Sequence, residues 1–213
     1  MKKLFTSLLI LSIVACEKDP KKPIEDRKDS TQQTAIDSTA VTQNPTNNKD
    51  ILLTQNNQEI LQALKNKDYK KLAEYIHPEK GIRFSMYAFV NPKEDKHFSK
   101  TDFEKYEPTK TLFTWGAMDG SGELYKATID DYLTKWVYSK DFVTGQTSLN
   151  EFLGKGNSLN NLKKIYPNAD FVENFIKGSE ANAEMDWKTL RLVFEEYQGK
   201  YYLVGVVNDQ WTI

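Results

Sequence analysis

The stretch that decides the fold is WKTLRLVFEEYQGKYYLVGVVNDQWTI, from Trp187 to Ile213. Its first run has apolar residues at every second position, namely Leu190, Leu192 and Phe194. A turn at Gln198-Gly199 separates it from a second run, Tyr201 to Val207, that is nearly all apolar or aromatic. Two such runs around a glycine-containing turn predict a β-hairpin. The expected faces of the second run are Tyr202, Val204 and Val206 on one side and Tyr201, Leu203 and Val207 on the other. The hairpin is therefore expected at the centre of a sheet that is covered on both faces.

Composition limits the remaining possibilities. Hydrophobic residues make up 39% of the 213 residues, and the mean hydropathy is −0.63, so a sizeable part of the chain is not expected to form a core. The net charge of −1 disfavours nucleic acid as a partner. One cysteine and two histidines exclude an intrachain disulfide and a Cys/His zinc site. No phosphate-cradle, dinucleotide, serine-hydrolase or zinc-protease motif occurs, so neither a cofactor nor a metal is expected.

The chain begins with an apolar run, Leu4 to Val14, that follows Lys2 and Lys3. This run is too short to span a bilayer but has the length of the hydrophobic region of a secretory signal. Its end, Ile13-Val14-Ala15-Cys16, resembles the lipobox of bacterial lipoproteins. The resemblance implies a signal peptide at residues 1–15 and acyl chains on Cys16, which would anchor the protein in a membrane. The alternative is an ordinary signal peptide with an incidental cysteine.

The residues after Cys16 predict a tether. Glu17-Lys18-Asp19 resembles the signal that sends some lipoproteins to the outer face of the outer membrane, although Pro20 stands where a second acidic residue is common. The expected location is therefore the cell envelope, lipid-anchored in the outer membrane, with surface exposure as a further expectation. Between Lys18 and Asp50 there is no aromatic residue, and polar residues dominate. Residues 16–50 are thus expected to form a flexible linker, and residues 51–213 a folded domain.

The domain is predicted to contain helices first and most strands late. Ile60, Leu61 and Leu64 have helical spacing, and Asp68 is a plausible N-cap for a second helix that ends at Pro78. Further elements are expected from Ile82 to Phe89 (strand), after Ser99 (helix), at Leu112–Trp115 (strand), after Thr128 (helix), around Leu162–Ile165 (helix) and from Ala169 to Ile176 (strand). This order indicates an α+β fold with a largely antiparallel sheet.

Two resemblances add to this interpretation. The segment from Ile60 to Pro78, together with Leu192–Glu195 and Tyr202–Val207, resembles the ketosteroid-isomerase-like superfamily, which includes the nuclear transport factor. The resemblance implies N-terminal helices packed on a strongly curved sheet, a cone that encloses a pocket. It does not explain the long insertion from about Asn91 to Asn168. Gly81–Ser85, Thr114-Trp115-Gly116 and Asp119–Gly122 resemble uncharacterised bacterial lipoproteins, which implies no activity.

The main candidate site lies on the predicted strand after Gly81. Period-two geometry places Arg83, Ser85 and Tyr87 on one face. If Arg191 faces the same cavity, two guanidinium groups could bind a carboxylate, phosphate or sulfate. The alternative is that these arginines pair with Glu195, Glu196 or Asp209 at a sheet margin.

Other groups carry weaker hypotheses. His77 could act as a general base, or could hydrogen-bond the chain that reverses into Gly81. Isomerases of the resembling superfamily use an acidic base and a hydroxyl or acid donor. Those residues do not align one by one with this sequence, so no catalytic role is carried over, and Asp209 and Tyr87 are only the nearest analogues. Asp119, Ser121 and Glu123 could bind calcium, or could form a plain glycine turn. The four tryptophans, Trp115, Trp136, Trp187 and Trp211, could stack on a sugar, with burial expected for Trp136 and Trp211.

The sequence as a whole predicts a lipid-anchored envelope or cell-surface lipoprotein with a non-catalytic binding domain. Its expected partners are the membrane and an unidentified small molecule or envelope protein. The alternative is an isomerase- or hydrolase-like pocket enzyme that uses an Asp or His base. A third possibility is protein binding through the middle insertion, which predicts an exposed apolar patch there.

Overall fold

The computed structural model describes residues 45–213. The predicted signal peptide, Cys16 and most of the predicted linker lie outside the described residues. Helix α1, Pro45–Lys65, begins ahead of the predicted domain start at Ile51. Pro45 suits the first helical position, where a missing N–H costs nothing. Lys49 in the first turns forms an ion pair with Asp170 on the sheet, with Nζ and Oδ2 2.8 Å apart.

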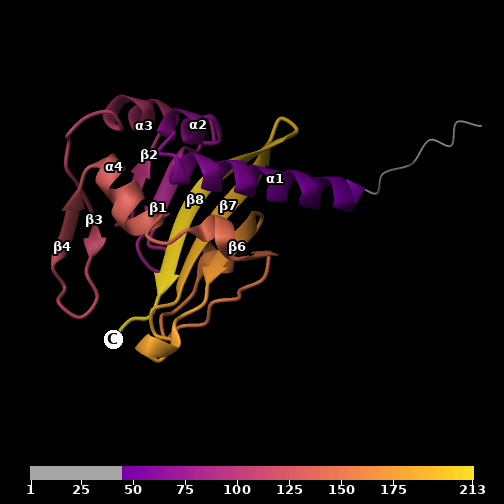
Figure 1. Cartoon of the computed structure of the whole chain (residues 1–213). Coiled ribbons are helices and arrows are strands. Elements are labelled where there is room, and N and C mark those ends of the chain that lie inside the picture. The colour runs from indigo at the N-terminus through magenta and orange to yellow at the C-terminus, as the bar shows by residue number, and fades with distance from the viewer. Residues whose placement is uncertain (1–44) are drawn as a thin grey trace, which may run out of the picture. The chain divides into compact units, whose positions relative to one another are not determined.

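A six-stranded sheet forms the frame of the described domain, in the order β2-β1-β8-β7-β6-β5 (Figure 1). Its strands are β1 (Ile82–Ser85), β2 (Lys96–Phe98), β5 (Gln146–Leu149), β6 (Asp170–Ile176), β7 (Lys188–Tyr197) and β8 (Lys200–Gln210). Neighbouring strands are antiparallel except for β1 and β8, which run parallel. A separate antiparallel ribbon consists of β3 (Phe113–Ala117) and β4 (Leu124–Ala127). The fold is therefore α+β with a mixed, mostly antiparallel sheet, as predicted.

The C-terminal hairpin lies in the middle of this sheet, which confirms the central strand pair. Gln198 and Gly199 both have positive φ, 52° and 77°, as the tight turn of a hairpin requires. The predicted faces of β8 are only partly correct, because the pairing with β7 shifts between Val193 and Phe194. This irregularity breaks the alternation, so Leu203 and Val206 share one core cluster while Val204 and Val207 share the other.

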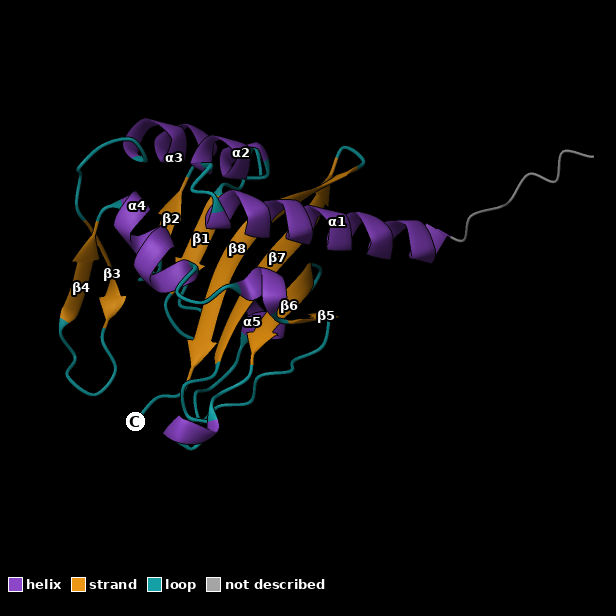
Figure 2. Ribbon diagram, viewed as in Figure 1, coloured by secondary structure: helices purple, strands orange, loops and turns teal. Residues whose placement is uncertain are grey.

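Helices cover both faces of the sheet (Figure 2). The α-helices after α1 are α2 (Tyr69–Glu74), α3 (Lys100–Tyr106), α4 (Ile129–Tyr132) and α5 (Leu162–Ile165). A π-helical turn, η1 (Leu133–Val137), extends α4, and short 3₁₀ turns lie at η2 (Phe142–Thr144) and η3 (Glu180–Asn182). The predicted starts after Asp68, Ser99 and Thr128 are confirmed. Each of these side chains accepts a hydrogen bond from a backbone N–H three residues later.

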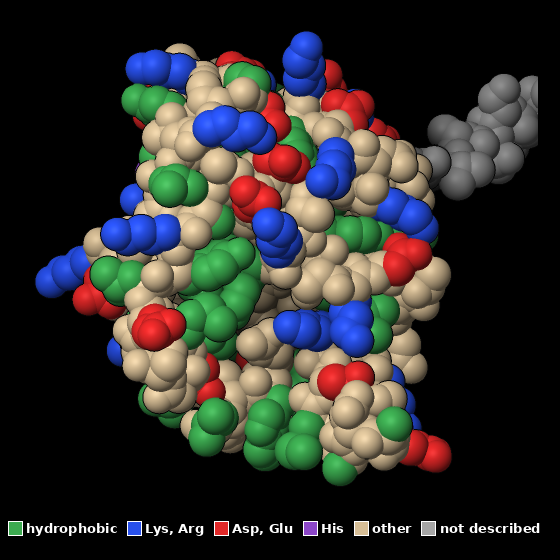
Figure 3. All heavy atoms as spheres, turned by 60° about the vertical axis from the view of Figure 1, so that its left-hand side comes forward, with side chains coloured by type: hydrophobic (Ala, Val, Ile, Leu, Met, Phe, Trp, Pro, Cys, Tyr) green, Lys and Arg blue, Asp and Glu red, His purple; other side chains and the backbone are tan. Residues whose placement is uncertain are grey.

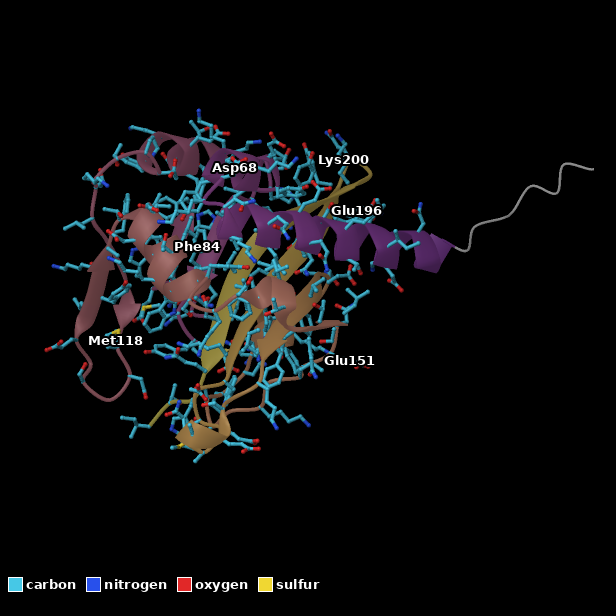
Figure 4. All side chains as sticks on the ribbon, viewed as in Figure 1. Asp68, Phe84, Met118, Glu151, Glu196 and Lys200 are labelled. Atoms are coloured by element: carbon cyan, nitrogen blue, oxygen red, sulfur yellow. The ribbon has the colours of Figure 1, made fainter. Side chains whose placement is uncertain are left out.

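Two hydrophobic clusters fill the two sides of the sheet. The larger one lies between the sheet and α1, α2, α3 and α4, and includes many aromatic rings. Phe84 of β1, labelled in Figure 4, packs edge-on against both Trp115 and Tyr132. The smaller cluster joins α5 to the other face, through Leu162, Phe171 and Val193 among others. Because both faces are covered, the apolar side chains on each side of the hairpin are buried.

Candidate functional site

The structure brings together three of the four residues of the predicted anion site on one face. Ser85 pairs with Val207 of β8, and Val207 pairs with Arg191 of β7. Arg83 lies two residues before Ser85 on the same strand, and hence on the same face. Tyr87 does not join them, because β1 ends at Ser85 rather than continuing to Phe89 as predicted.

Arg191 is fully buried and forms ion pairs with two carboxylates. Its Nε lies 2.5 Å from Oε2 of Glu173, and its Nη2 lies 2.9 Å from Oδ2 of Asp209. The ring centroid of Phe152 lies 5.0 Å from the guanidinium carbon. One positive charge beside two carboxylates leaves no surplus charge for an anion. The predicted alternative is confirmed for the partner, Asp209, but wrong for the location, because Arg191 lies on the central strand β7 and not at a sheet margin.

The guanidinium of Arg83 also forms hydrogen bonds within the protein. Its Nη1 donates to the backbone carbonyls of Pro92, at 3.0 Å, and of Asp95, at 3.2 Å. These bonds hold the turn that links β1 to β2. The prediction of an anion pocket between Arg83 and Arg191 is therefore wrong. The charge of Arg191 is neutralised by two buried carboxylates, and Arg83 hydrogen-bonds the turn between β1 and β2.

His77 has the structural role rather than the catalytic one. Its Nδ1 accepts hydrogen bonds from the backbone N–H groups of Glu79, at 3.2 Å, and Lys80, at 3.0 Å. Its carbonyl accepts from the N–H of Gly81 at 2.9 Å, so the residue organises the predicted chain reversal. Burial, with a contribution from the charge of Lys80, lowers the pKa of His77 below its usual value.

A pocket of about 220 Å³ opens beside Tyr87, between the segment after β1 and strand β3. Its walls are Met86, Tyr87, Phe89, Asn91, Glu94, Asp95, Trp115, Gly116 and Ala117. Figure 3, which turns the β3–β4 side forward, shows hydrophobic side chains gathered beside a hollow on this side of the domain. The pocket thus combines aromatic walls with two carboxyl groups.

Asp95 is the carboxyl group that the surrounding residues hold in place. Its Oδ2 accepts from the hydroxyl of Ser85 and from the backbone N–H of Asn91, the latter at 2.8 Å. Burial raises the pKa of Asp95, while these two hydrogen bonds and the charge of Arg83 act in the opposite direction. Ser85, predicted to bind a ligand, instead donates its hydroxyl to Asp95, a residue that the sequence pattern did not single out.

Tyr132 of α4 lies against the pocket wall. Its ring stacks on Trp115 with centroids 3.6 Å apart and an interplanar angle of 2°. Its side chain is fully buried, and its hydroxyl has no hydrogen-bond partner among the described residues. Burial raises the pKa of this hydroxyl well above its usual value, and the charge of Asp95 is the next contribution. Such an unpartnered buried hydroxyl is uncommon and calls for an explanation.

A larger recess of about 330 Å³ lies between α1, α2 and the tip of the β7–β8 hairpin. Two of its polar side chains already have partners within the protein. Asn56 donates to the carbonyl of Tyr201, and Tyr75 donates to Glu59.

The structure supports neither a calcium loop at Asp119 nor a sugar-stacking platform of tryptophans within the described residues. Asp119 accepts from the backbone N–H of Ile213 at 2.6 Å, and no cluster of metal-ligating side chains occurs within residues 45–213.

The tryptophans form no platform, because Trp115 and Trp187 are buried in different places. Trp136 is half-buried, and its Nε1 donates to the carbonyl of Met86. Trp211 is 47% exposed, so its expected burial is wrong, because β8 ends at Gln210.

Comparison with known proteins gives this chain no family. No family model matches it, and no curated protein matches it. Within the part of the chain that the structure describes, no helix is both long and apolar enough to cross a membrane. The site must therefore be interpreted from its own residues.

Proposed function

We propose that this protein is a lipid-anchored lipoprotein of the cell envelope whose folded domain binds a small ligand without transforming it. The observation that carries the binding role is the pocket at Asp95, where a positioned carboxylate lies among aromatic walls. Behind one of these walls, Trp115, stacks Tyr132, whose buried hydroxyl has no partner among the described residues. The two groups that were weighed as catalytic bases have other partners. His77 accepts backbone hydrogen bonds, and Asp209 is paired with Arg191.

The proposed architecture is the cone that the resemblance implies. Support comes from helices α1 and α2 on one face of the six-stranded sheet and from the bond between Leu203 N–H and the carbonyl of Tyr75, which joins α2 to the central hairpin. In this domain aromatic packing around Phe84 fills the space between helices and sheet. The ligand site is therefore placed at the margin of the packed region rather than in its middle.

The proposed anchor is Cys16, on the lipobox pattern alone. Several acyl chains, each worth about 0.8 kcal/mol per buried methylene, would hold the protein at a membrane durably. The matched test compares Cys16→Ala with Ser30→Ala in cells fed a clickable fatty acid. We expect Cys16→Ala to lose both the label and its place in the membrane pellet, while Ser30→Ala keeps both. Retention of the fatty-acid label by Cys16→Ala would contradict the anchor.

A second candidate function is favoured by one observation, the raised pKa of Asp95. A carboxyl group of this kind can act as a general base or acid in a pocket enzyme. The two functions differ in the fate of the ligand. A compound recovered unaltered after prolonged incubation with the protein, as seen by NMR, supports the binding module. Turnover that Asp95→Asn abolishes would establish the enzyme instead.

A further inference from the structure

We propose that the pocket at Asp95 takes a primary alkylammonium group, the charged end of a small amine. The inference rests on the proposed binding function and specifies its ligand class. The first support is charge. Among the described residues that line the pocket there are two carboxylates, Glu94 and Asp95, and no lysine, arginine or histidine. A cation entering here would meet only negative charge from the lining side chains, although the guanidinium of Arg83 lies behind Asp95.

The carboxylates are held in place by the protein. Asp95 accepts from Ser85 and from the N–H of Asn91, while Oε2 of Glu94 accepts from the side-chain amide of Asn91 at 2.8 Å. These donors are all uncharged. The nearby cation, Arg83, donates its Nη1 hydrogen bonds to backbone carbonyls instead. The negative charge in the pocket therefore has no hydrogen-bonded cationic partner among these contacts, and the bonds fix its position in advance.

Aromatic walls give the second support. Tyr87, Phe89 and Trp115 line the same pocket as the carboxylates. The face of an aromatic ring attracts a cation through its quadrupole, most strongly where water is excluded. Trp115 is buried, while Phe89 is 49% exposed. The charged end of the ligand is thus assigned to the buried side, and its alkyl tail to the side of Phe89.

The unpartnered hydroxyl of Tyr132 gives the third support. Tyr132 is fully buried and does not itself line the pocket, but its ring stacks on Trp115, which does. After burial, the charge of Asp95 contributes most to the raised pKa of this hydroxyl. The proposal requires that an ammonium group bound at the Asp95 carboxylate also donates an N–H to this oxygen. A quaternary ammonium ion has no N–H and would leave the hydroxyl unpartnered. The volume of about 220 Å³ is smaller than ordinary drug-sized sites of about 300–1,000 Å³. The pocket therefore suits a small amine or the end of a longer one.

The test titrates the detergent-solubilised full chain with n-propylammonium, tetramethylammonium, propan-1-ol and propionate at matched ionic strength, following heat and tryptophan fluorescence. We expect saturable binding of n-propylammonium, with the other three compounds at least about tenfold weaker. Asp95→Asn should weaken n-propylammonium binding by about tenfold or more. Glu180→Gln, on the exposed turn η3 and outside the pocket, is the matched control and should bind as the native chain does.

Tyr132→Phe separates a ligand-binding role from a structural one. Removing a buried, unpartnered hydroxyl should leave the melting temperature unchanged or raise it, because no internal hydrogen bond is lost. If the hydroxyl accepts from the ligand, the same change should weaken n-propylammonium binding several-fold, about fivefold or more. Circular dichroism at the titration temperature confirms that each variant is folded.

Different outcomes overturn the proposed ligand class and the proposed non-catalytic function. Preferential binding of propan-1-ol or propionate overturns the amine and leaves a binding module. Absence of saturable binding by n-propylammonium, or binding that neither Asp95→Asn nor Tyr132→Phe weakens, also overturns it. An amine that binds at this pocket but is recovered chemically altered supports the ligand class and overturns the non-catalytic function.

Discussion

Tyr132 lies flat on Trp115, with ring centroids 3.6 Å apart and planes only 2° from parallel. The two residues come from α4 and β3, both within the middle segment from about Asn91 to Asn168. Trp115 also donates its indole N–H to the carbonyl of Ala127, which ties the β3–β4 ribbon together from inside. The insertion thus supplies part of the main core and a wall of the candidate pocket, and is not only a surface decoration.

The buried ion group at Arg191 should be essential for stability. Arg191→Met leaves Glu173 and Asp209 buried without their cation, so we expect a loss of about 3–5 kcal/mol in the free energy of unfolding at neutral pH. Lys80→Met, which breaks an exposed pair with Glu195, should cost no more than about 1 kcal/mol. Urea denaturation of both variants measures the difference. Equal losses of free energy in the two variants would show that the buried ion group contributes no more to stability than an exposed ion pair.

Asp95 should make stability depend on pH. Because burial raises its pKa in the folded chain, the folded state binds more protons than the unfolded state between the ordinary value, about 3.9, and the raised one. The free energy of unfolding should therefore fall as the pH rises through this window and then level off. Asp95→Asn should remove this contribution, as urea titrations from pH 4 to pH 7 would reveal.

Ser85→Ala provides the complementary measurement. The Ser85 hydroxyl donates to Asp95 and favours its ionised form. Its removal should raise the pKa of Asp95 further and extend the falling part of the stability curve to higher pH. A curve that does not move with Ser85→Ala would contradict this role for the serine.

Helix α1 should depend on a pair of buried amides. Asn57 on α1 and Asn174 on β6 donate to each other's side-chain oxygen at 2.9 and 2.8 Å, and both are fully buried. Asn57→Leu should destabilise the domain by about 1–3 kcal/mol, because Asn174 keeps a polar group without that partner. The double variant Asn57→Leu/Asn174→Leu should recover part of the loss in thermal unfolding. Strict additivity of the two single changes would refute the coupling.

The N-cap at Asp68 should contribute a smaller, local amount. Its carboxylate accepts from the N–H of Lys71 at 3.0 Å and begins α2. Asp68→Ala should cost about 1 kcal/mol in denaturant unfolding, and Asp68→Asn much less, since asparagine is also a good cap. A similar loss in both variants would point to charge rather than capping.

Local chemistry accounts for what could be predicted without coordinates. The caps at Asp68, Ser99 and Thr128 each involve atoms within a few residues, and the turn at Gln198-Gly199 needs only two left-handed residues. The sequence pattern of the final hairpin also indicated its burial, because both faces were apolar. These features hold wherever the segment lies in the fold.

Tertiary packing decided the rest. The pairing irregularity on β8 reassigned the faces of Val204 and Leu203, and no local pattern encodes a bulge that depends on the partner strand. Arg191 was expected to meet a ligand, but the register of β6, β7 and β8 places it between Glu173 and Asp209. The candidate pocket joins the turn at Asp95 to Trp115 and its neighbours on β3, and contacts between segments so far apart in the sequence exist only once the chain has folded.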